Sequence, residues 1–212
     1  MIYINKGSEP MMLRAHKSKP HSNYNNLDKD TLDSIRDSLL NEQGYICAYC
    51  MKRIEKSNMK IEHYISQSFC NEKALDYSNM LGVCSGNMGS GGKNKTCDTH
   101  RSIRNQTLTV SPLDQTSIAA ITYSSNGEIT SDDANIKYDI SETLNLNHIY
   151  LKEGRKAVLN KSKQMLIDRM PKNGPWSKDK LLKIRNDFLS LDKGELEEYV
   201  GVIIYCLDKK LK

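Results

Sequence analysis

The stretch from Cys47 to His100 most constrains what this chain can fold into. It holds five of the six cysteines and two of the five histidines. Cys47 and Cys50 are separated by two residues, a spacing that puts two thiolates on one tight turn and is typical of half a tetrahedral metal site. Little regular apolar periodicity surrounds these motifs, and a small core of this kind needs a metal as a staple. The sequence therefore predicts a centre held by structural zinc.

Cys84 and Cys97 are the best candidates for the other two zinc ligands. The loop between them is rich in Gly, Asn and Lys and is loose enough to bring both sulfurs inwards. Four thiolates form a closed structural site that does not touch a substrate. Cys70 and His100 are the alternative ligands, and otherwise Cys70 and Cys206 are interpreted as buried thiols. A redox role is the other interpretation of the first pair, but no βαβ pattern surrounds it.

Composition and charge favour a folded cytoplasmic protein that meets a polyanion. The 212 residues, 38% hydrophobic and 27% charged, fit one domain or a small core with an added helical region. No apolar run approaches the ~20 residues that span a bilayer, and the first residues lack the features of a secretory signal. Residues 44–105 carry a net charge of +4 and residues 106–143 a net charge of −5. A basic segment around the cysteines suits nucleic acid, although scattered surface lysines also give such sums by chance.

The first half of the chain predicts an arm followed by a helix. Residues 1–26 are polar and basic, and Pro10 and Pro20 interrupt any helix there. We therefore expect an extended N-terminal arm that lies on its own core or on a partner. Residues 27–43 carry apolar side chains at i, i+3 and i+7 behind a cluster of aspartates, the pattern of an amphipathic helix, and Gly44 is placed to end it.

The second half predicts a β-hairpin and then helices. Asn126-Gly127 between apolar residues is a strong hairpin signal, so residues 106–140 are expected to form a β-hairpin insertion. Residues 141–212 show helical apolar stripes and form the helical C-terminal region. The first long helix is expected to run to about Met170. This helix is expected to end there because it is followed by residues that disfavour a helix, namely Pro171, Gly174 and Pro175. The predicted fold class is α+β, with residues 27–105 as the zinc-bearing core.

An ordered set of polar residues alternates with the cysteines. Glu62-His63 follows the first pair, Asn79 lies shortly before the next zinc cysteine, and His100 shortly after the last. A lone histidine is more often structural than catalytic. Here the order and the basic context favour phosphodiester chemistry, and a neutral imidazole with a pKa near ~6.5 suits a general base.

This set resembles the HNH nuclease family, whose active site is a β-hairpin plus a helix around one divalent metal, the ββα-metal fold. Matched residue by residue, the first motif falls on Glu62-His63, the middle asparagine on Asn79 and the final histidine on His100. The zinc-bearing branch places its cysteines where the four predicted ligands stand. This chain departs from the family pattern at the second cysteine pair. Many members have a short Cys-x-x-Cys there, whereas twelve residues separate Cys84 from Cys97 in this sequence. It also departs at Ile103, where many members have a basic residue.

The resemblance implies a role for each residue. His63 takes a proton from water, and Asn79 orients the imidazole by accepting its other ring N–H. Glu62 and His100 hold a divalent ion, Mg²⁺ or another, which stabilises charge on the leaving oxygen. Basic residues contact flanking phosphates, or else form a solvated loop. These basic residues are Lys93, Lys95, Arg101 and Arg104.

A longer likeness covers most of the chain. The start Ile4–Pro10, the turn Ser111–Asp114 and the helical tail look like the HNH subunit of Septu-type and retron-associated anti-phage systems. There the nuclease subunit works beside an ABC/SMC-like ATPase, so this likeness implies that partner and, in a retron, a reverse transcriptase with its msDNA. Two other classes stay open: a zinc-ribbon module that binds nucleic acid without cutting it, and an assembly subunit that binds a partner.

Overall fold

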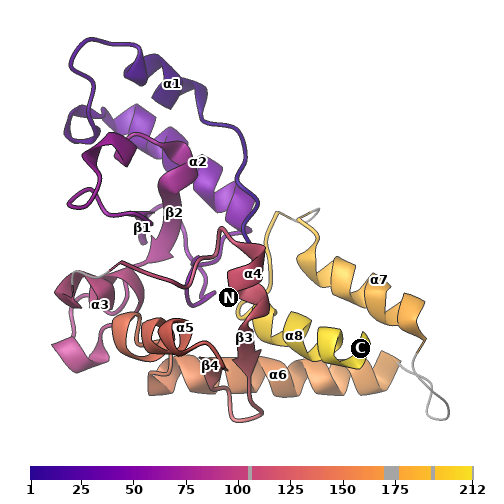
Figure 1. Ribbon diagram of the computed structural model, residues 1–212. Coiled ribbons are helices and arrows are strands. Elements are labelled where there is room, and N and C mark those ends of the chain that lie inside the picture. The colour runs from indigo at the N-terminus through magenta and orange to yellow at the C-terminus, as the bar shows by residue number, and fades with distance from the viewer. Residues whose placement is uncertain (105–106, 170–176, 192–193, 212) are drawn as a thin grey trace.

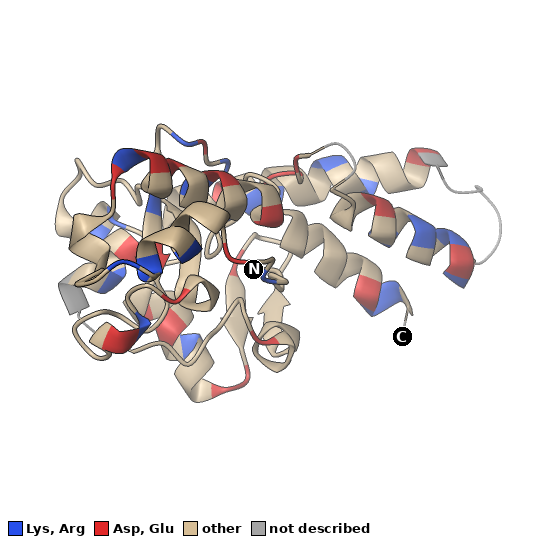
Figure 2. Cartoon of the chain, turned by 90° about the horizontal axis from the view of Figure 1, so that it is seen from above, with Lys and Arg blue, Asp and Glu red and all other residues tan. Residues whose placement is uncertain are grey.

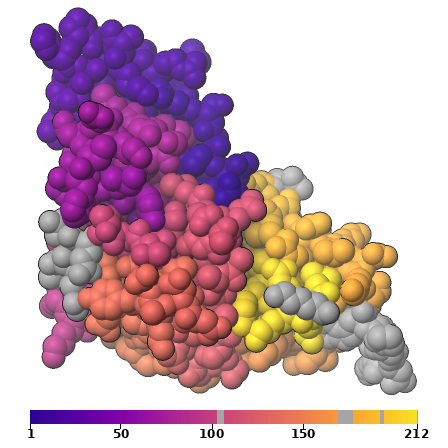
Figure 3. Space-filling view, viewed as in Figure 1, coloured from indigo at the N-terminus to yellow at the C-terminus, as the bar shows by residue number. Residues whose placement is uncertain are grey.

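The computed structural model describes residues 1–104, 107–169, 177–191 and 194–211. It is a mixed α+β chain with small antiparallel sheets, as expected. Figure 1 shows two limbs. The N-terminal elements form one limb and the C-terminal helices the other, and the space-filling view shows a notch between the two (Figure 3). One cluster of buried apolar side chains runs through both limbs, from Leu13 through Met80 and Ile129 to Ile203.

The N-terminal segment contains a helix where we expected an extended arm. Helix α1 (Met11–Lys17) begins directly after Pro10. Proline is tolerated at a helix start, because the first N–H groups have no intrahelical partner there. Leu13 and His16 lie one turn apart and are buried, and α1 packs on the following helix, α2 (Lys29–Gln43). The extended conformation is therefore a wrong prediction for residues 11–17, which pack on the chain's own core.

Helix α2 (Lys29–Gln43) confirms the amphipathic pattern. The Asp28 side chain accepts the Thr31 N–H at 2.7 Å and caps the first turn. Gly44 ends the helix in the left-handed conformation, with φ of +59°. A Cβ at this position would also lie 2.4 Å from Leu196 Cγ, so glycine is needed for both the turn and the close packing.

A two-stranded antiparallel hairpin and a helix carry most of the predicted site. Strand β1 (Met59–His63) pairs with β2 (Met80–Cys84), with His63 opposite Met80. A long loop with two 3₁₀ turns, Asn71–Lys73 and Tyr77–Asn79, joins the strands. A further 3₁₀ turn (Gly92–Asn94) leads into helix α3 (Cys97–Arg104), which packs against β2.

A buried glutamine joins α2 to this hairpin. The Gln43 Nε2 amide donates to the carbonyls of Gly82 at 2.8 Å and Ile46 at 2.9 Å, and Gln43 Oε1 accepts the Gly82 N–H at 2.7 Å. Gln43 is 2% exposed. These three bonds satisfy backbone groups that water does not reach, so they fix α2 relative to β2.

The second hairpin confirms the Asn126-Gly127 signal. After helix α4 (Gln115–Ala119), strand β3 (Ile121–Tyr123) pairs antiparallel with β4 (Ile129–Ser131). A short helix α5 (Ala134–Tyr138) and a π-helical turn (Asp139–Thr143) follow, neither of which was predicted. Helix α5 packs against β4, and the π-helical turn packs against α3.

Three helices complete the chain, as the apolar stripes predicted. They are α6 (Ile149–Arg169), α7 (Lys178–Leu189) and α8 (Val200–Leu211), and α8 packs on both of the others. The predicted breakers Pro171, Gly174 and Pro175, with Met170, lie outside the described residues. Within the part that the structure describes, no helix combines the length and apolar character needed to cross a membrane.

Replacing Gln43 by methionine tests the link between α2 and the hairpin. Methionine keeps the volume but leaves the Gly82 N–H and the Ile46 carbonyl without their Gln43 partner, whereas the Gly82 carbonyl keeps the Ala48 N–H at 3.0 Å. We therefore expect a loss of about 2–4 kcal/mol in the free energy of unfolding. Urea denaturation measures it. The matched control is Gln164→Met on the exposed face of α6, expected within about 0.5 kcal/mol of wild type. An equal effect of the two substitutions would show that the buried bonds do not hold α2.

Candidate functional site

Four cysteine sulfurs converge between the two strands and α3. The Sγ atoms of Cys47, Cys50, Cys84 and Cys97 all lie within 4.8 Å of one another. The Sγ–Sγ distance is 3.7 Å for Cys50–Cys84 and Cys84–Cys97, and 4.0 Å for Cys47–Cys97. A tetrahedral zinc ion with Zn–S bonds of about 2.3 Å separates its sulfurs by about 3.8 Å. The cluster therefore has the donors and spacing to hold a metal ion such as zinc.

The backbone brings these cysteines in from three places. Cys47 and Cys50 lie on a turn closed by a hydrogen bond from the Met51 N–H to the Cys47 carbonyl at 2.9 Å. Cys84 is the last residue of β2, and Cys97 is the first of α3, where its N–H donates to Leu144. The turn, the strand and the helix thus meet at the four sulfurs.

The pKa values of the four thiols indicate that the cluster would bind a cation. Hydrogen bonds with the other three sulfurs, and then burial, raise the pKa of Cys97, and hydrogen bonds with Cys47 and Cys84 raise that of Cys50. Burial also opposes ionisation of Cys47, but hydrogen bonds from the other three sulfurs hold its pKa well below the usual value. Negative charge is therefore concentrated on one thiolate, and a divalent ion would ionise all four.

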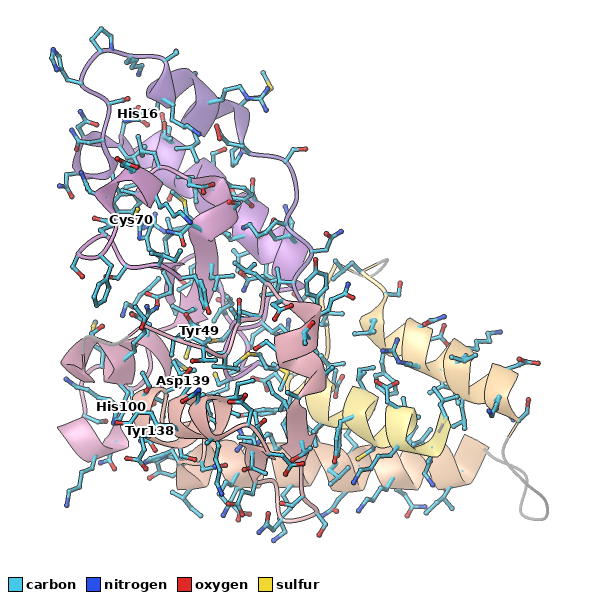
Figure 4. All side chains as sticks on the ribbon, in the orientation of Figure 1. His16, Tyr49, Cys70, His100, Tyr138 and Asp139 are labelled. Carbon is cyan, nitrogen blue, oxygen red and sulfur yellow. The ribbon has the colours of Figure 1, made fainter. Side chains whose placement is uncertain are left out.

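The alternative zinc ligands lie elsewhere. In Figure 4 Cys70 sits in the loop between β1 and β2, well above Tyr49 of the cysteine turn, and His100 sits below it. Across the described ranges, the four cysteines form the one group of three or more histidine, cysteine or acidic ligand atoms close enough to share an ion, and it contains neither Cys70 nor His100.

Beside this cluster lies a buried carboxylate, Glu62, at the end of β1. Glu62 is 8% exposed and its Oε1 accepts a hydrogen bond from the Tyr49 hydroxyl at 3.2 Å. The Arg101 guanidinium forms an ion pair with the same oxygen and donates to the Tyr64 carbonyl at 2.8 Å. Arg101 comes from α3, so this pair holds the helix against the end of the strand.

A second carboxylate, Asp98, faces Glu62 from the first turn of α3. The two carboxyl groups lie close enough for each to shift the pKa of the other. Lys60, two residues before Glu62 in β1, forms an ion pair with Asp98 Oδ2. Two carboxylates in contact either share a proton or bind a cation.

The pKa values of the pair diverge accordingly. Burial, and then the hydrogen bond and charge of Asp98, raise the pKa of Glu62 to about 8 despite Arg101. Burial also disfavours the charged form of Asp98, but the Glu62 hydrogen bond and Lys60 outweigh it and lower its pKa. Without a metal, the shared proton resides on Glu62.

The ion site expected from the resemblance pairs Glu62 with His100, and this pairing stays a prediction. Successive helical residues turn by about 100°, so Asp98 and Arg101 share a face of α3 while His100 points away from it. The His100 Nδ1 lies 3.0 Å from the Thr143 carbonyl, in the π-helical turn. Asp98 is the α3 residue beside Glu62.

His63 follows Glu62 and is held as a neutral imidazole. Its Nε2 lies 2.9 Å from the Ala74 carbonyl, which can only accept, so Nε2 carries the proton and Nδ1 the lone pair. The Tyr24 ring packs edge-on against the imidazole at 4.6 Å, and the Gln67 amide lies 3.3 Å from Nδ1. Burial lowers the His63 pKa. An unprotonated ring nitrogen suits a general base.

Asn79 does not bond the His63 ring, contrary to the expected contact. Its Oδ1 accepts the Ile65 N–H at 2.8 Å, and its Nδ2 donates to the Ile65 carbonyl at 2.9 Å and the Lys73 carbonyl at 3.3 Å. These bonds close the loop that contains Ala74. Asn79 thus acts on His63 through the loop whose carbonyl holds the ring.

The four basic residues differ in position. Arg101 is 4% exposed and pairs with Glu62, so it is not a surface contact for phosphate, which corrects that expectation. Lys93 is exposed and Lys95 half-buried in the loop before α3, and the side chain of Arg104 lies outside the described residues. Figure 2 shows acidic and basic residues along the whole chain.

Sequence reasoning missed Asp98 and Tyr49. Asp98 directly follows the predicted ligand Cys97, and its i, i+3 spacing to Arg101 was the available signal once a helix began there. Tyr49 lies between two ligands, and nothing in its spacing distinguishes it from a core aromatic.

Comparison with known proteins gives one partial match. An Escherichia coli protein described as "Retron Ec83 putative HNH endonuclease" is 29% identical to this chain over 119 residues, covering 48% of this chain and 46% of that protein. No protein-family model matches the chain. The likeness supports a relationship to HNH proteins, over less than half of the relative's length.

Substituting single cysteines tests the metal centre. Structural zinc contributes on the order of 10 kcal/mol to small zinc domains, so losing one ligand is expected to lower both metal content and melting temperature strongly. We expect about one zinc per chain in the wild type, and a large loss of zinc and stability in Cys84→Ser. Cys206→Ser, equally half-buried but outside the cluster, is the control and should retain both. Equal metal content in the two variants would rule out the four-cysteine site.

The raised pKa of Glu62 predicts how stability depends on pH without Mg²⁺. Between about pH 4.5 and 8 the folded chain keeps a proton on Glu62 that the unfolded chain has lost. The free energy of unfolding therefore falls as pH rises through this window, by at most about 1.4 kcal/mol per unit from this group. Urea denaturation of Glu62→Gln should show a smaller fall, whereas the exposed control Glu55→Gln should match wild type. An unchanged slope in Glu62→Gln would contradict the shared proton.

Proposed function

We propose that this chain is a metal-dependent HNH endonuclease that hydrolyses phosphodiester bonds of nucleic acid. The observation that carries the proposal is the pair of neighbouring carboxylates, Glu62 of β1 and Asp98 of α3; the next residue of β1, His63, has an imidazole whose Nδ1 is unprotonated. Two strands followed by a helix supply these residues, which is the order of a ββα-metal core. The name and identity of the E. coli relative support the same reading.

The donor set fits a hard divalent ion. Carboxylate oxygens are the ligands that Mg²⁺ and Mn²⁺ prefer, and Mg²⁺ keeps several waters when few protein groups bind it. We assign Glu62 and Asp98 as these ligands in place of Glu62 and His100, because Asp98 contacts Glu62. When bound, the ion would polarise the phosphate and stabilise charge on the leaving oxygen.

His63 supplies the base in this proposal. Its Nδ1 takes a proton from water as the water oxygen attacks phosphorus, and the bond from phosphorus to the 3′-oxygen breaks. The Ala74 carbonyl keeps the ring in the tautomer with an unprotonated Nδ1, and Asn79 holds the loop of Ala74 in place. Lys93 and Lys95 lie on the loop that enters α3, where they would contact flanking phosphates without reading sequence.

The biological setting is part of the proposal. The relative's name places it in a retron. The proposed role in defence against phage in the cytoplasm rests on the likeness to the HNH subunit of retron-associated systems. An ABC/SMC-like ATPase and a reverse transcriptase with its msDNA are the proposed partners. The ATPase rests on the resemblance of the start, the Ser111–Asp114 turn and the helical tail.

Cleavage of a DNA and RNA panel with Mg²⁺ tests the function. His63→Ala should lower the rate about 10²- to 10⁴-fold, the usual contribution of general base catalysis, with fold and zinc content intact. Asp98→Asn should require more Mg²⁺, whereas His100→Ala should cut like wild type. Full cleavage by His63→Ala would refute the assignment. Binding without any cleavage by the wild type, with or without the ATPase, would favour the zinc-ribbon alternative.

A further inference from the structure

A single side chain joins the cysteine turn to the carboxylate pair. Tyr49 stands between Cys47 and Cys50, is fully buried, and donates its hydroxyl proton to Glu62 Oε1 at 3.2 Å. Burial and the neighbouring charge of Glu62 raise the Tyr49 pKa well above the usual value, so the phenol remains a donor.

The hydrogen bonds of Glu62 are asymmetric. The Tyr49 hydroxyl and the Arg101 guanidinium both donate hydrogen bonds to Glu62 Oε1. These two bonds leave Oε2 on the other side of the carboxylate. A carboxylate whose two donors share one oxygen can offer the other to an ion, which here would take the place of the proton shared with Asp98. Such supporting hydrogen bonds orient metal ligands, and their loss costs about 10- to 100-fold in metal affinity.

The second carboxylate is tied to the same cysteine cluster through the backbone. Asp98 directly follows Cys97, whose N–H is fixed by the Leu144 carbonyl at 2.8 Å. Both ends of the carboxylate pair therefore depend on where the cysteines lie: Glu62 through the Tyr49 hydroxyl, and Asp98 through its peptide bond to Cys97.

We propose that Tyr49 is a positioning residue that orients Glu62 for the divalent ion and couples the cysteine centre to the carboxylate site. The inference rests on the proposed function, because it gives Glu62 an ion to bind. The Tyr49 ring fills the core, and its hydroxyl sets the direction of the carboxylate. Arg101 supplies the opposite charge, so the two donors have separable roles.

Mn²⁺ binding to the zinc-loaded full chain, measured by electron paramagnetic resonance without nucleic acid, tests the inference. Tyr49→Phe removes only the hydroxyl and should weaken Mn²⁺ binding about tenfold while zinc content stays at the wild-type level. Tyr45→Phe is the matched control, because its hydroxyl also bonds one side-chain oxygen, Asn41 Oδ1 at 3.3 Å, outside the site. It should bind Mn²⁺ like wild type.

Glu62→Gln separates the possible failures. If it weakens Mn²⁺ binding and adding Tyr49→Phe weakens it no further, the hydroxyl acts through Glu62 as proposed. If Glu62→Gln weakens binding but Tyr49→Phe does not, the inference is overturned and the proposed ion site stands. If Glu62→Gln binds like wild type, the proposed ion site fails and the inference fails with it. Loss of zinc in Tyr49→Phe would overturn the inference by assigning the hydroxyl to the cysteine centre.

Discussion

The convergence of four cysteine sulfurs is the interaction on which the rest of this structure depends. It joins a turn, the end of a strand and the start of a helix, and the spacing of the four sulfurs matches what one zinc ion requires. Small segments of this kind cannot bury enough apolar surface to define their own geometry. Because the four sulfurs lie together, α3 lies beside the end of β1. Asp98 and Arg101 of the helix then contact Glu62 of the strand.

Beside the four cysteines lies the pair of buried carboxylates that we propose as the site of a hard divalent ion. Glu62 and Asp98 contact each other in a buried setting, where two negative charges are costly, so the free chain keeps a proton between them. The same arrangement suits a divalent ion, which would replace that proton. Arg101 and Lys60 offset part of the negative charge, which explains why an arginine expected at the surface is buried. The two centres touch at Tyr49 and at the Cys97–Asp98 peptide.

Local signals in the sequence predicted much of the fold. Asp28 and Gly44 mark the ends of α2, and Asn126-Gly127 marks the second hairpin, because capping and turn geometry depend on neighbouring residues. The predictions that missed a feature concern residues whose role depends on contacts with distant parts of the chain. Pro10 reads as a helix breaker but stands at the start of α1, where no N–H is needed. The family resemblance placed His100 in the ion site, and that role stays a prediction. Asp98 was missed because its position beside Glu62 depends on the phase of α3 relative to β1, which only the packed structure reveals.

Anomalous diffraction from crystals of the zinc-loaded chain soaked in Mn²⁺ tests the central claim most directly, because it locates both metals without relying on activity. Our account predicts a zinc peak among the four sulfurs and a manganese peak bound by both Glu62 and Asp98, on the side of Glu62 away from Tyr49. A manganese peak at His100, or zinc bound by any set of residues other than the four cysteines, would contradict it.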